Sequence, residues 1–193
     1  MNDIENINNL FDESAHFILE SKKLTSQLSK IIDIVIKAYN NGNKVVIFGN
    51  GGSAADSQHF AAELIGRFKL ERKSLSAISL TTDSSIITAL GNDYGFEYVF
   101  SRQCESIVNK GDVVFAISTS GNSRNVINGV ITCKEIGAIT IGLVGENGGN
   151  LQQFVDFLIH APTTSTPRIQ EVHRIIIHII CELVEQSFKT FKK

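Results

Sequence analysis

The sequence predicts an α/β fold: one doubly wound domain with a five-stranded parallel sheet flanked by helices, preceded by an N-terminal helical pair. Five short runs rich in β-branched residues recur along the chain, and helical spacings of apolar residues lie between most of them. Near-continuous apolar strands that alternate with helices are typical of a parallel sheet covered on both faces. At this length we expect a single domain over residues 1–193, with helices in 1–42 and the α/β core with its C-terminal helix in 43–193.

The N-terminal segment, residues 4–40, is predicted to form two helices. Its apolar residues recur mostly at intervals of three and four, as they do along one face of a helix. Asn41-Gly42 is expected to end the second helix, because it offers a residue that tolerates the left-handed conformation.

The strands and the last helix follow from composition and from turn residues. The last helix is expected from Thr166-Pro167, a hydroxyl N-cap followed by proline at the first helical position, to about Phe188. Ligands of doubly wound sheets bind beyond the carboxyl ends of the strands, so the loops after the strands are candidate sites. The expected strands are Lys44–Phe48, Ala77–Leu80, Asp112–Ile117, Ala138–Val144 and Val155–His160.

Composition and charge exclude several classes of protein. A formal net charge of −2 argues against a protein that coats nucleic acid. The longest apolar run, IIIHIICELV, is too short to span a bilayer, and the N-terminus lacks the features of a secretory signal. The three cysteines, Cys104, Cys133 and Cys181, form no C-x-x-C motif, which favours a reducing compartment. We therefore expect a cytoplasmic protein with neither a nucleic-acid nor a membrane partner.

A glycine loop follows the first expected strand. Residues 49–54, GNGGSA, fit the G-x-G-x-x-A pattern of dinucleotide-binding proteins. The supporting acidic residue should end the second strand, but Glu71 precedes that strand and Asp83 follows it. No lysine follows the glycines, so the phosphate-binding Walker pattern also fails. A tight strand-to-helix turn is favoured, and a dinucleotide enzyme is kept as an alternative.

A hydroxyl-rich loop follows the third expected strand. Residues 118–123, STSGNS, precede a helical stretch. Hydroxyls and free backbone N–H groups at a helix N-terminus form an anion site, which the helix dipole favours. One hydroxyl suffices to cap a helix, and this loop holds four around a glycine. The surplus favours a phosphate or another small anion.

Two helices carry residues that could bind a metal or transfer protons. His59 and Glu63 are four residues apart and therefore share one helix face, where they could hold a divalent metal or act as acid and base. On the last helix, His178 lies at the margin of the buried apolar stripe. A histidine in such a position is more often a hydrogen-bonded core residue than a functional one. His173 is expected at the surface.

Four segments, taken together, resemble the phosphoheptose isomerases of the sugar isomerase (SIS) domain family. They are GNGGSAADSQHFAAEL, TTDSSIITALGNDYG, STSGNS and TPRIQEVHRIIIHIICELVE, and the similarity covers nearly the whole chain. STSGNS alone indicates only an SIS domain, whereas the four segments in this order are much more diagnostic.

The resemblance implies an aldose–ketose isomerase that converts sedoheptulose 7-phosphate to D-glycero-D-manno-heptose 7-phosphate, in the synthesis of ADP-heptose for lipopolysaccharide core. It implies a cytoplasmic homotetramer with one Zn²⁺ per subunit, held by His59, Glu63, Gln170 and His178. Glu63 would be the catalytic base and His178 the acid. The expected substrate contacts, with neighbouring Ser53 included, are Asn50, Gly51, Gly52, Ser53, Asn92, Asp93, Ser118, Thr119, Ser120, Ser123 and Gln170.

The alternative within the same family is a non-catalytic SIS-domain regulator, such as a DnaA-binding replication-initiation protein. Such a protein resembles the enzyme less at the ligand positions, and this chain keeps all four implied metal ligands. Arg67 is a further candidate for the anionic substrate, with a surface salt bridge equally expected, and Arg124 has no assigned role.

Helix geometry separates two of the implied metal ligands. Gln170 and His178 lie eight residues apart on one predicted helix, which is roughly 12 Å along its axis. An irregular first turn, or ligands from different subunits, would let both reach one ion. We expect a site at a subunit interface of the homotetramer, with Glu63 and His178 as residues that different chains could supply.

Overall fold

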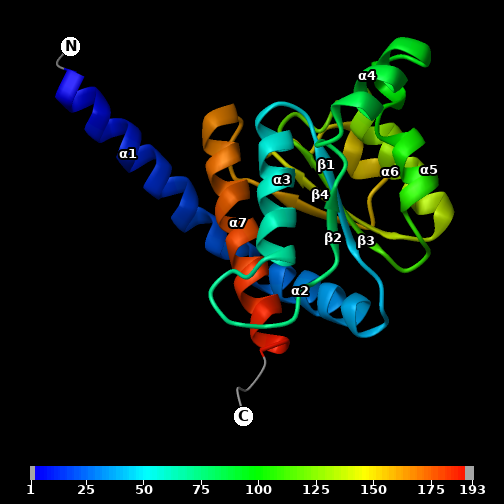
Figure 1. The fold of residues 1–193 in the computed structure, drawn as a ribbon. Helices are drawn as coiled ribbons and strands as arrows, with labels where there is room; N and C mark the ends of the chain where they lie inside the picture. The colour runs from blue at the N-terminus through cyan, green and yellow to red at the C-terminus, as the bar shows by residue number, and fades with distance from the viewer. Residues whose placement is uncertain (1–2, 190–193) are drawn as a thin grey trace.

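A five-stranded, all-parallel sheet forms the centre of the fold, with helices packed on both of its faces (Figure 1). The computed structural model describes residues 3–189, so residues 1–2 and 190–193 of the expected domain lie outside the described residues. All five predicted strands are confirmed, with bounds that shift by no more than two residues. In spatial order they are β2 (Ala77–Ser79), β1 (Val45–Gly49), β3 (Val113–Ser118), β4 (Ile139–Val144) and β5 (Phe157–His160).

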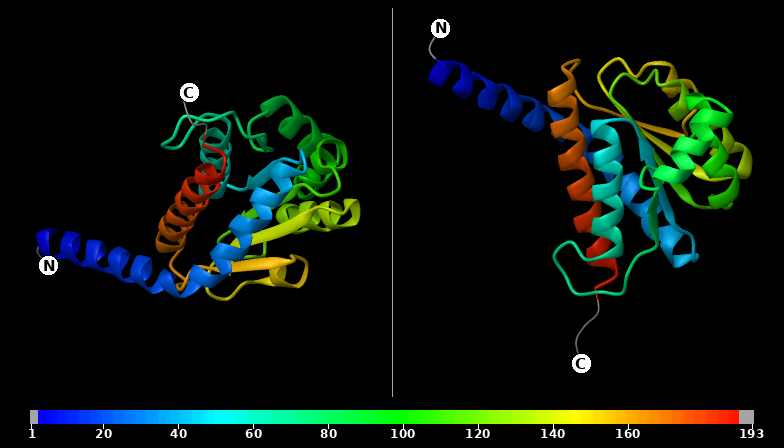
Figure 2. Two further views of the ribbon diagram at one scale, coloured as in Figure 1. Left: turned by 90° about the horizontal axis from the view of Figure 1, so that it is seen from below. Right: turned by 45° about the horizontal axis from the view of Figure 1, so that its top comes forward.

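Helices cover the two faces of the sheet as the apolar strands predict (Figure 2). Three long helices pack on one face: α2 (Thr25–Asn40), α3 (Gly52–Ile65) and α7 (Thr166–Ser187). The shorter α5 (Ser101–Ile107) and α6 (Arg124–Ile136) cover the other face.

Alternate residues of each strand enter two separate cores. Ile47 of β1 and Phe115 of β3 pack toward the three long helices, whereas the next residue of β1, Phe48, packs toward α5 and α6. Successive side chains of a strand point to opposite faces, so a sheet covered twice needs apolar residues at every position. This requirement explains why the strands appear in the sequence as nearly continuous apolar runs.

The first helix, α1 (Asp3–Glu20), projects away from the sheet (Figure 1). None of its described residues is buried, and α7 runs beside its inner part. Arg168 of α7 links the two helices by donating to the carbonyl of Leu10 at 3.1 Å and by lying 3.7 Å from the carboxylate of Glu13. Within one chain, the apolar side of α1 therefore remains exposed; its large apolar side chains are Ile4, Ile7, Leu10, Phe11 and Leu19.

The ends of the helices follow the expected turn chemistry with one difference. Gly42 has a φ of +80° after the Asn41 C-cap, as predicted. At α7 the N-cap is Ser165 rather than Thr166, while Pro167 occupies the first turn as expected. No helix among residues 3–189 combines the length and apolarity needed to cross a membrane.

The remaining elements are short and connect the layers. α4 (Ser84–Asp93) has no buried residue and lies at the edge of the fold. Three 3-10 turns complete the described chain: η1 (Ser21–Leu24), η2 (Phe96–Tyr98) and η3 (Asn150–Gln153).

Two helical glycines give a matched test of core packing. A Cβ at Gly129 of α6 would lie 2.9 Å from Phe48 and 3.1 Å from Phe100, which are stacked on each other. Gly129→Ala should therefore destabilise the protein by about 1–3 kcal/mol through overpacking. Gly91→Ala in α4 meets no atom closer than 4.0 Å and should be neutral or stabilising by up to about 1 kcal/mol, because alanine favours helices. Urea unfolding measures both, and a Gly129→Ala midpoint at or above wild type would contradict the packing argument.

Candidate active site

The crevice at the carboxyl ends of β1 and β3 is where the chain reverses its direction of winding. From β1 the chain moves outward to β2, and it then returns to β3 on the other side of β1. Loops that leave two such strands in opposite directions open a crevice, which is the usual binding position in this architecture. The glycine loop and the hydroxyl loop form its two sides.

Asn50 and Asn125 join these two loops. Each side-chain amide donates to the other's oxygen, at 2.8 and 2.9 Å, and Asn125 is buried. Asn50 follows β1, and Asn125 lies in the first turn of α6, so the pair fixes the width of the crevice. The sequence motifs contained Asn50 but not Asn125, whose partner lies 75 residues away.

The hydroxyl loop lies at the N-terminus of α6. Ser118 donates to Ser123 across the loop at 3.3 Å, and Ser120 accepts the backbone N–H of Asn122 at 3.1 Å. Ser123 occupies the N-cap position but makes no capping bond. Thr119 and Ser120 also line a cavity of about 270 Å³ that reaches the first turn of α7.

Glycine is required where the hydroxyl loop meets the loop after β4. Gly121 has a φ of +65°, and a Cβ there would lie 2.0 Å from the carbonyl oxygen of Gly148. Backbone therefore packs directly on backbone, which only a residue without a side chain permits.

Along one face, α3 and α7 run parallel and touch at three levels. At the first, a Cβ on Gly52 would lie 2.2 Å from the amide nitrogen of Gln170. At the second, Arg174 donates to the carboxylate of Asp56. At the third, His59 and His178 face each other with their Nε2 atoms 2.9 Å apart. Residue numbers rise together on both helices, so the helices point the same way, side by side in both views (Figures 1 and 2).

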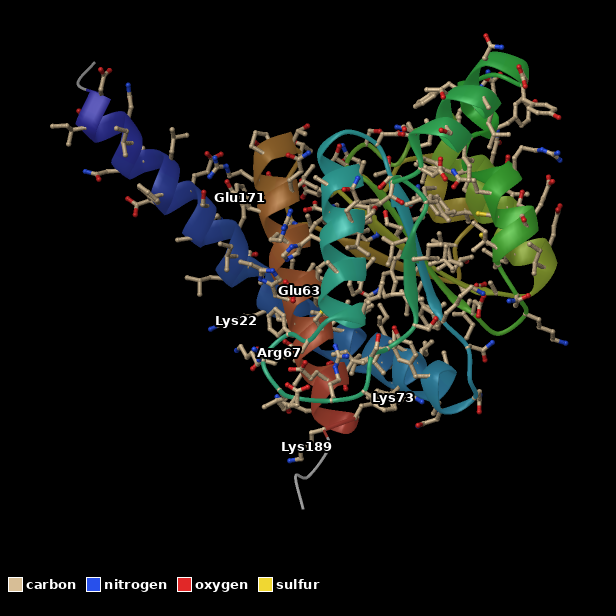
Figure 3. All side chains as sticks on the ribbon, in the orientation of Figure 1. Lys22, Glu63, Arg67, Lys73, Glu171 and Lys189 are labelled. Carbon is tan, nitrogen blue, oxygen red and sulfur yellow. The ribbon has the colours of Figure 1, made fainter. Side chains whose placement is uncertain are left out.

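His59, Glu63 and His178 form one polar cluster at the third level. Glu63 Oε1 lies 3.5 Å from His59 Nε2. The ring of Phe68 lies against His178, with centroids 5.4 Å apart. Figure 3 shows Glu63 near the C-terminal end of α3, beside α7, with Arg67 just beyond it. One chain thus brings all three members of the cluster together, so Glu63 and His178 approach the same imidazole without a second subunit, and a site completed at a subunit interface stays a prediction.

Burial and the neighbouring charge of Arg174 favour the neutral form of His59. Burial lowers the pKa of His59, and the positive charge of Arg174 lowers it further, while Glu63 opposes both. A neutral imidazole can accept a proton or offer a lone pair to a metal. Asp56 is buried beside this cluster, and burial raises its pKa against the opposing effect of Arg174.

The cluster provides part of a metal site. Two imidazole nitrogens and a carboxylate are donors that Zn²⁺ accepts, and the facing Nε2 atoms fit a shared ion. Nevertheless, residues 3–189 contain no group of three or more His, Cys, Asp or Glu side chains placed so that they could hold a metal ion. Gln170 lies at Gly52, two levels away, so this chain brings together three of the four implied ligands.

Other predicted site residues lie outside the cluster. Asn92 and Asp93 end α4, where both are exposed and the Asn92 amide donates to the Asp93 carboxylate at 2.8 Å. Arg67 is exposed and lies 3.9 Å from Glu71, in the surface ion pair considered above. Arg124 is exposed and lines a hollow of about 320 Å³ with Asn50 and Ser123.

Sequence reasoning missed Asp56, Arg174 and Phe68. The signal for the first two was their spacing: Asp56 precedes His59 by one turn, and Arg174 precedes His178 by one turn. Phe68 lies in a loop, and nothing local connects it to His178.

Comparison with known proteins gives consistent results. The SIS domain family model matches residues 11–145. A Helicobacter hepaticus protein named phosphoheptose isomerase is 55% identical over 164 residues, which cover 85% of this chain and 84% of the relative. A protein of the same name from Aquifex aeolicus is 50% identical over 184 residues, 95% of this chain and 96% of the relative.

Solved structures agree with the sequences. The phosphoheptose isomerase of Neisseria gonorrhoeae superposes with a TM-score of 0.91 at 40% identity, and that of Francisella tularensis with 0.93 at 33% identity. Each comparison covers 96% of this chain and 100% of the other.

The expected surface position of His173 is wrong, and its burial has a consequence for stability. His173 is fully buried, with Nε2 3.1 Å from the carbonyl oxygen of Val144. Burial lowers the pKa of His173 from 6.5 to about 4. The unfolded chain therefore binds the extra proton first, so stability should fall by up to about 3 kcal/mol as the pH drops from about 6.5 to about 4.

Denaturant unfolding at several pH values tests this expectation. His173→Gln should flatten the pH dependence across that window, whereas His16→Gln, at an exposed histidine, should leave it unchanged. Equal slopes for His173→Gln and wild type would contradict the assignment.

Proposed function

The chain belongs to the phosphoheptose isomerase family of SIS domain proteins, and we propose that it interconverts sedoheptulose 7-phosphate and D-glycero-D-manno-heptose 7-phosphate. The observation that carries the proposal is the cluster of His59, Glu63 and His178, in a chain about half identical to isomerases of that name. The hydroxyl loop at the switch point supplies an anion site in the same fold.

Aldose–ketose interconversion moves a proton between adjacent carbons, most simply through an enediol. It needs a base near C1 and C2, and an acid near the carbonyl oxygen. Glu63 is the proposed base and His178 the proposed acid. Both side chains approach His59 Nε2, and the lowered pKa of His59 favours its uncharged form.

Zinc is the proposed metal, one ion per subunit, and when bound it would orient and polarise the substrate oxygens. His59, Glu63 and His178 would hold it, because His59 Nε2 lies 2.9 Å from His178 Nε2 and 3.5 Å from Glu63 Oε1. Gln170 would join this set only from another subunit, because its own chain places it against Gly52. There it is well placed to contact a sugar hydroxyl beside the glycine loop.

The phosphate is proposed to bind the hydroxyl loop. Its contacts would be Ser118, Thr119, Ser120 and Ser123, together with buried Ser53 at the start of α3 and the uncapped N-terminus of α6. Binding the remote phosphate helps to orient the reacting carbons. Asn50, Gly51, Gly52, Asn92 and Asp93 are proposed contacts of the sugar.

Assembly and cellular role follow from the same assignment. We place the enzyme in the cytoplasm as a homotetramer that supplies ADP-heptose synthesis for lipopolysaccharide core, without a nucleic-acid or membrane partner. The exposed apolar side of α1 supports assembly, because exposed apolar surface of this kind marks a protein interface. The three cysteines are free and buried, which is compatible with a reducing compartment.

Incubation of the purified protein with sedoheptulose 7-phosphate tests the function. NMR should show the aldose product in the presence of Zn²⁺. Prolonged chelation should abolish its formation, and added zinc should restore it. Full activity in protein verified as metal-free would remove zinc from the mechanism. Absence of product with metal bound would contradict the enzyme assignment and favour a regulator that binds sugar phosphate without converting it.

Variants should separate the chemical step from phosphate binding. Glu63→Gln and His178→Gln should each lower kcat by about 10² or more, because each removes a proton carrier. Ser120→Ala and Ser123→Ala should act mainly by raising KM, since each removes one donor to the phosphate. Steady-state kinetics distinguish the two classes. A Glu63 variant that changed only KM, with a serine variant that changed only kcat, would reverse the assignment.

A further inference from the structure

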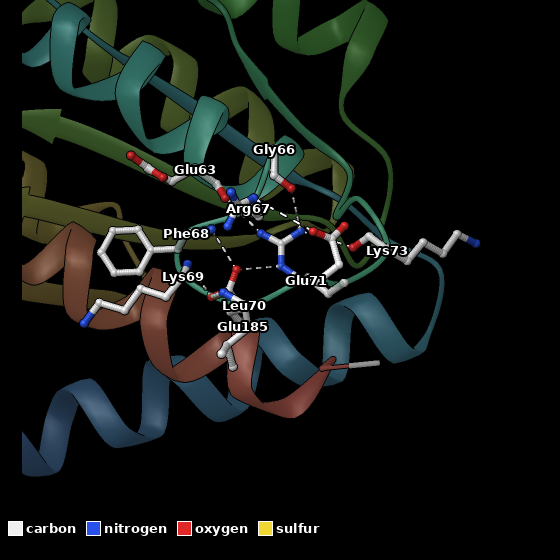
Figure 4. A network of polar contacts seen from close by, with 10 residues as sticks. Glu63, Gly66, Arg67, Phe68, Lys69, Leu70, Glu71, Lys73 and Glu185 are labelled. Carbon is white, nitrogen blue, oxygen red and sulfur yellow. Dashed lines mark hydrogen bonds and ion pairs between the residues drawn. The ribbon is translucent and has the colours of Figure 1, made fainter. Parts of the chain in front are cut away.

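A buried carboxylate on α7 holds the loop that follows α3. The side chain of Glu185 is 1% exposed, and it accepts the backbone N–H groups of Phe68, Lys69 and Leu70 at 2.7, 2.6 and 2.6 Å (Figure 4). Three consecutive N–H groups thus converge on one anion, an arrangement that binds anions strongly. Burial would raise the pKa of Glu185, but these bonds and the charge of Arg72 outweigh it and hold that pKa below its usual value.

Arg72 connects the same loop to the end of α3. Its side chain is also 1% exposed, and its Nε lies 3.3 Å from Glu185. Its Nη2 donates to the carbonyl of Glu63 at 2.9 Å, and its Nη1 donates to the carbonyls of Gly66 and Lys73 at 3.3 and 3.1 Å. The guanidinium therefore holds the backbone of the proposed base directly.

The opposite end of this network reaches the proposed acid. Glu185 lies two turns after His178 on α7, and the loop that it binds places the Phe68 ring against the His178 ring. Glu63 and His178 come from different helices, and this network connects those helices beyond their three levels of direct contact.

Stability alone gives a weak reason for such a pair. Burying two charges is costly, and apolar side chains of similar size often stabilise a protein as well or better. We propose that Glu185 and Arg72 are a positioning pair that sets the separation of Glu63 and His178 through the loop over residues 66–72. This inference rests on the proposed function.

Two glutamates on α7 allow a matched comparison. Glu185→Gln keeps the size of the side chain but removes its charge and directs an NH₂ group toward donors. Glu182→Gln makes the same change at an exposed carboxylate that binds the same loop, through Lys69 Nζ at 2.8 Å. Glu185→Gln should lower kcat about tenfold or more with little change in KM, because small misplacements of reacting groups are costly. Glu182→Gln should behave as wild type.

Two further measurements separate positioning from loss of structure. Circular dichroism and thermal unfolding verify that each variant is folded. Amide hydrogen exchange of residues 68–70 should accelerate in Glu185→Gln and not in Glu182→Gln. A folded Glu185→Gln enzyme with kcat within about threefold of wild type, or an equal loss in Glu182→Gln, overturns the inference.

Phe68→Leu decides the matter if Glu185→Gln fails to fold. It leaves the ion pair intact and removes only the ring against His178, so a lower kcat at unchanged KM supports the inference and an unchanged kcat overturns it. Failure of the proposed function is seen separately, as wild-type protein with bound zinc that forms no product. In that event the ring resonances of His178 decide: a shift in Glu185→Gln, which keeps the Phe68 ring, supports the positioning role if Glu182→Gln causes none, and no shift overturns it.

Discussion

The parallel alignment of α3 and α7 is the constraint on which the candidate site depends. Both helices rise by the same distance per residue, so side chains one turn apart on one helix meet side chains one turn apart on the other. Gly52 meets Gln170, Asp56 meets Arg174, and His59 meets His178. An antiparallel pair with the same residues would bring Gly52 toward His178 instead and would disperse the cluster.

The sheet makes this alignment possible and supplies the other end of the site. Both helices pack on the same face of the sheet, and α3 begins directly after β1, at the edge where the hydroxyl loop follows β3. An anion held at that edge would lie beside the first level of the helix pair, and the imidazoles lie two levels further along it. In the proposed mechanism, phosphate binding and proton transfer thus occupy successive positions along one pair of helices.

Buried charges bracket the histidine cluster on both sides. Asp56 and Arg174 lie one turn before it, and Arg72 with Glu185 lies beyond it, at the end of α3. Each carboxylate is buried with a guanidinium partner, since an unpaired buried charge would be strongly destabilising. The two pairs place opposite charges close to the proposed active site without leaving a net charge beside it.

Local periodicity predicts much of this protein. Spacings within one element are enough to predict the strands, the helical N-terminal segment, the hydroxyl loop, and the position of His59 and Glu63 on one helix face. Backbone geometry repeats such spacings without reference to the rest of the chain. Even the burial of His173 could have been predicted, because it shares the apolar spacing of Ile169, Ile176 and Ile180. A surface position was expected instead because its side chain is polar.

Local spacing could not predict three other contacts: that of His178 with His59, that of Gln170 with Gly52, and that of Glu185 with the loop at Phe68. These contacts span more than 110 residues and depend on the direction and offset of α7 relative to α3, which packing on the sheet sets and no local spacing records.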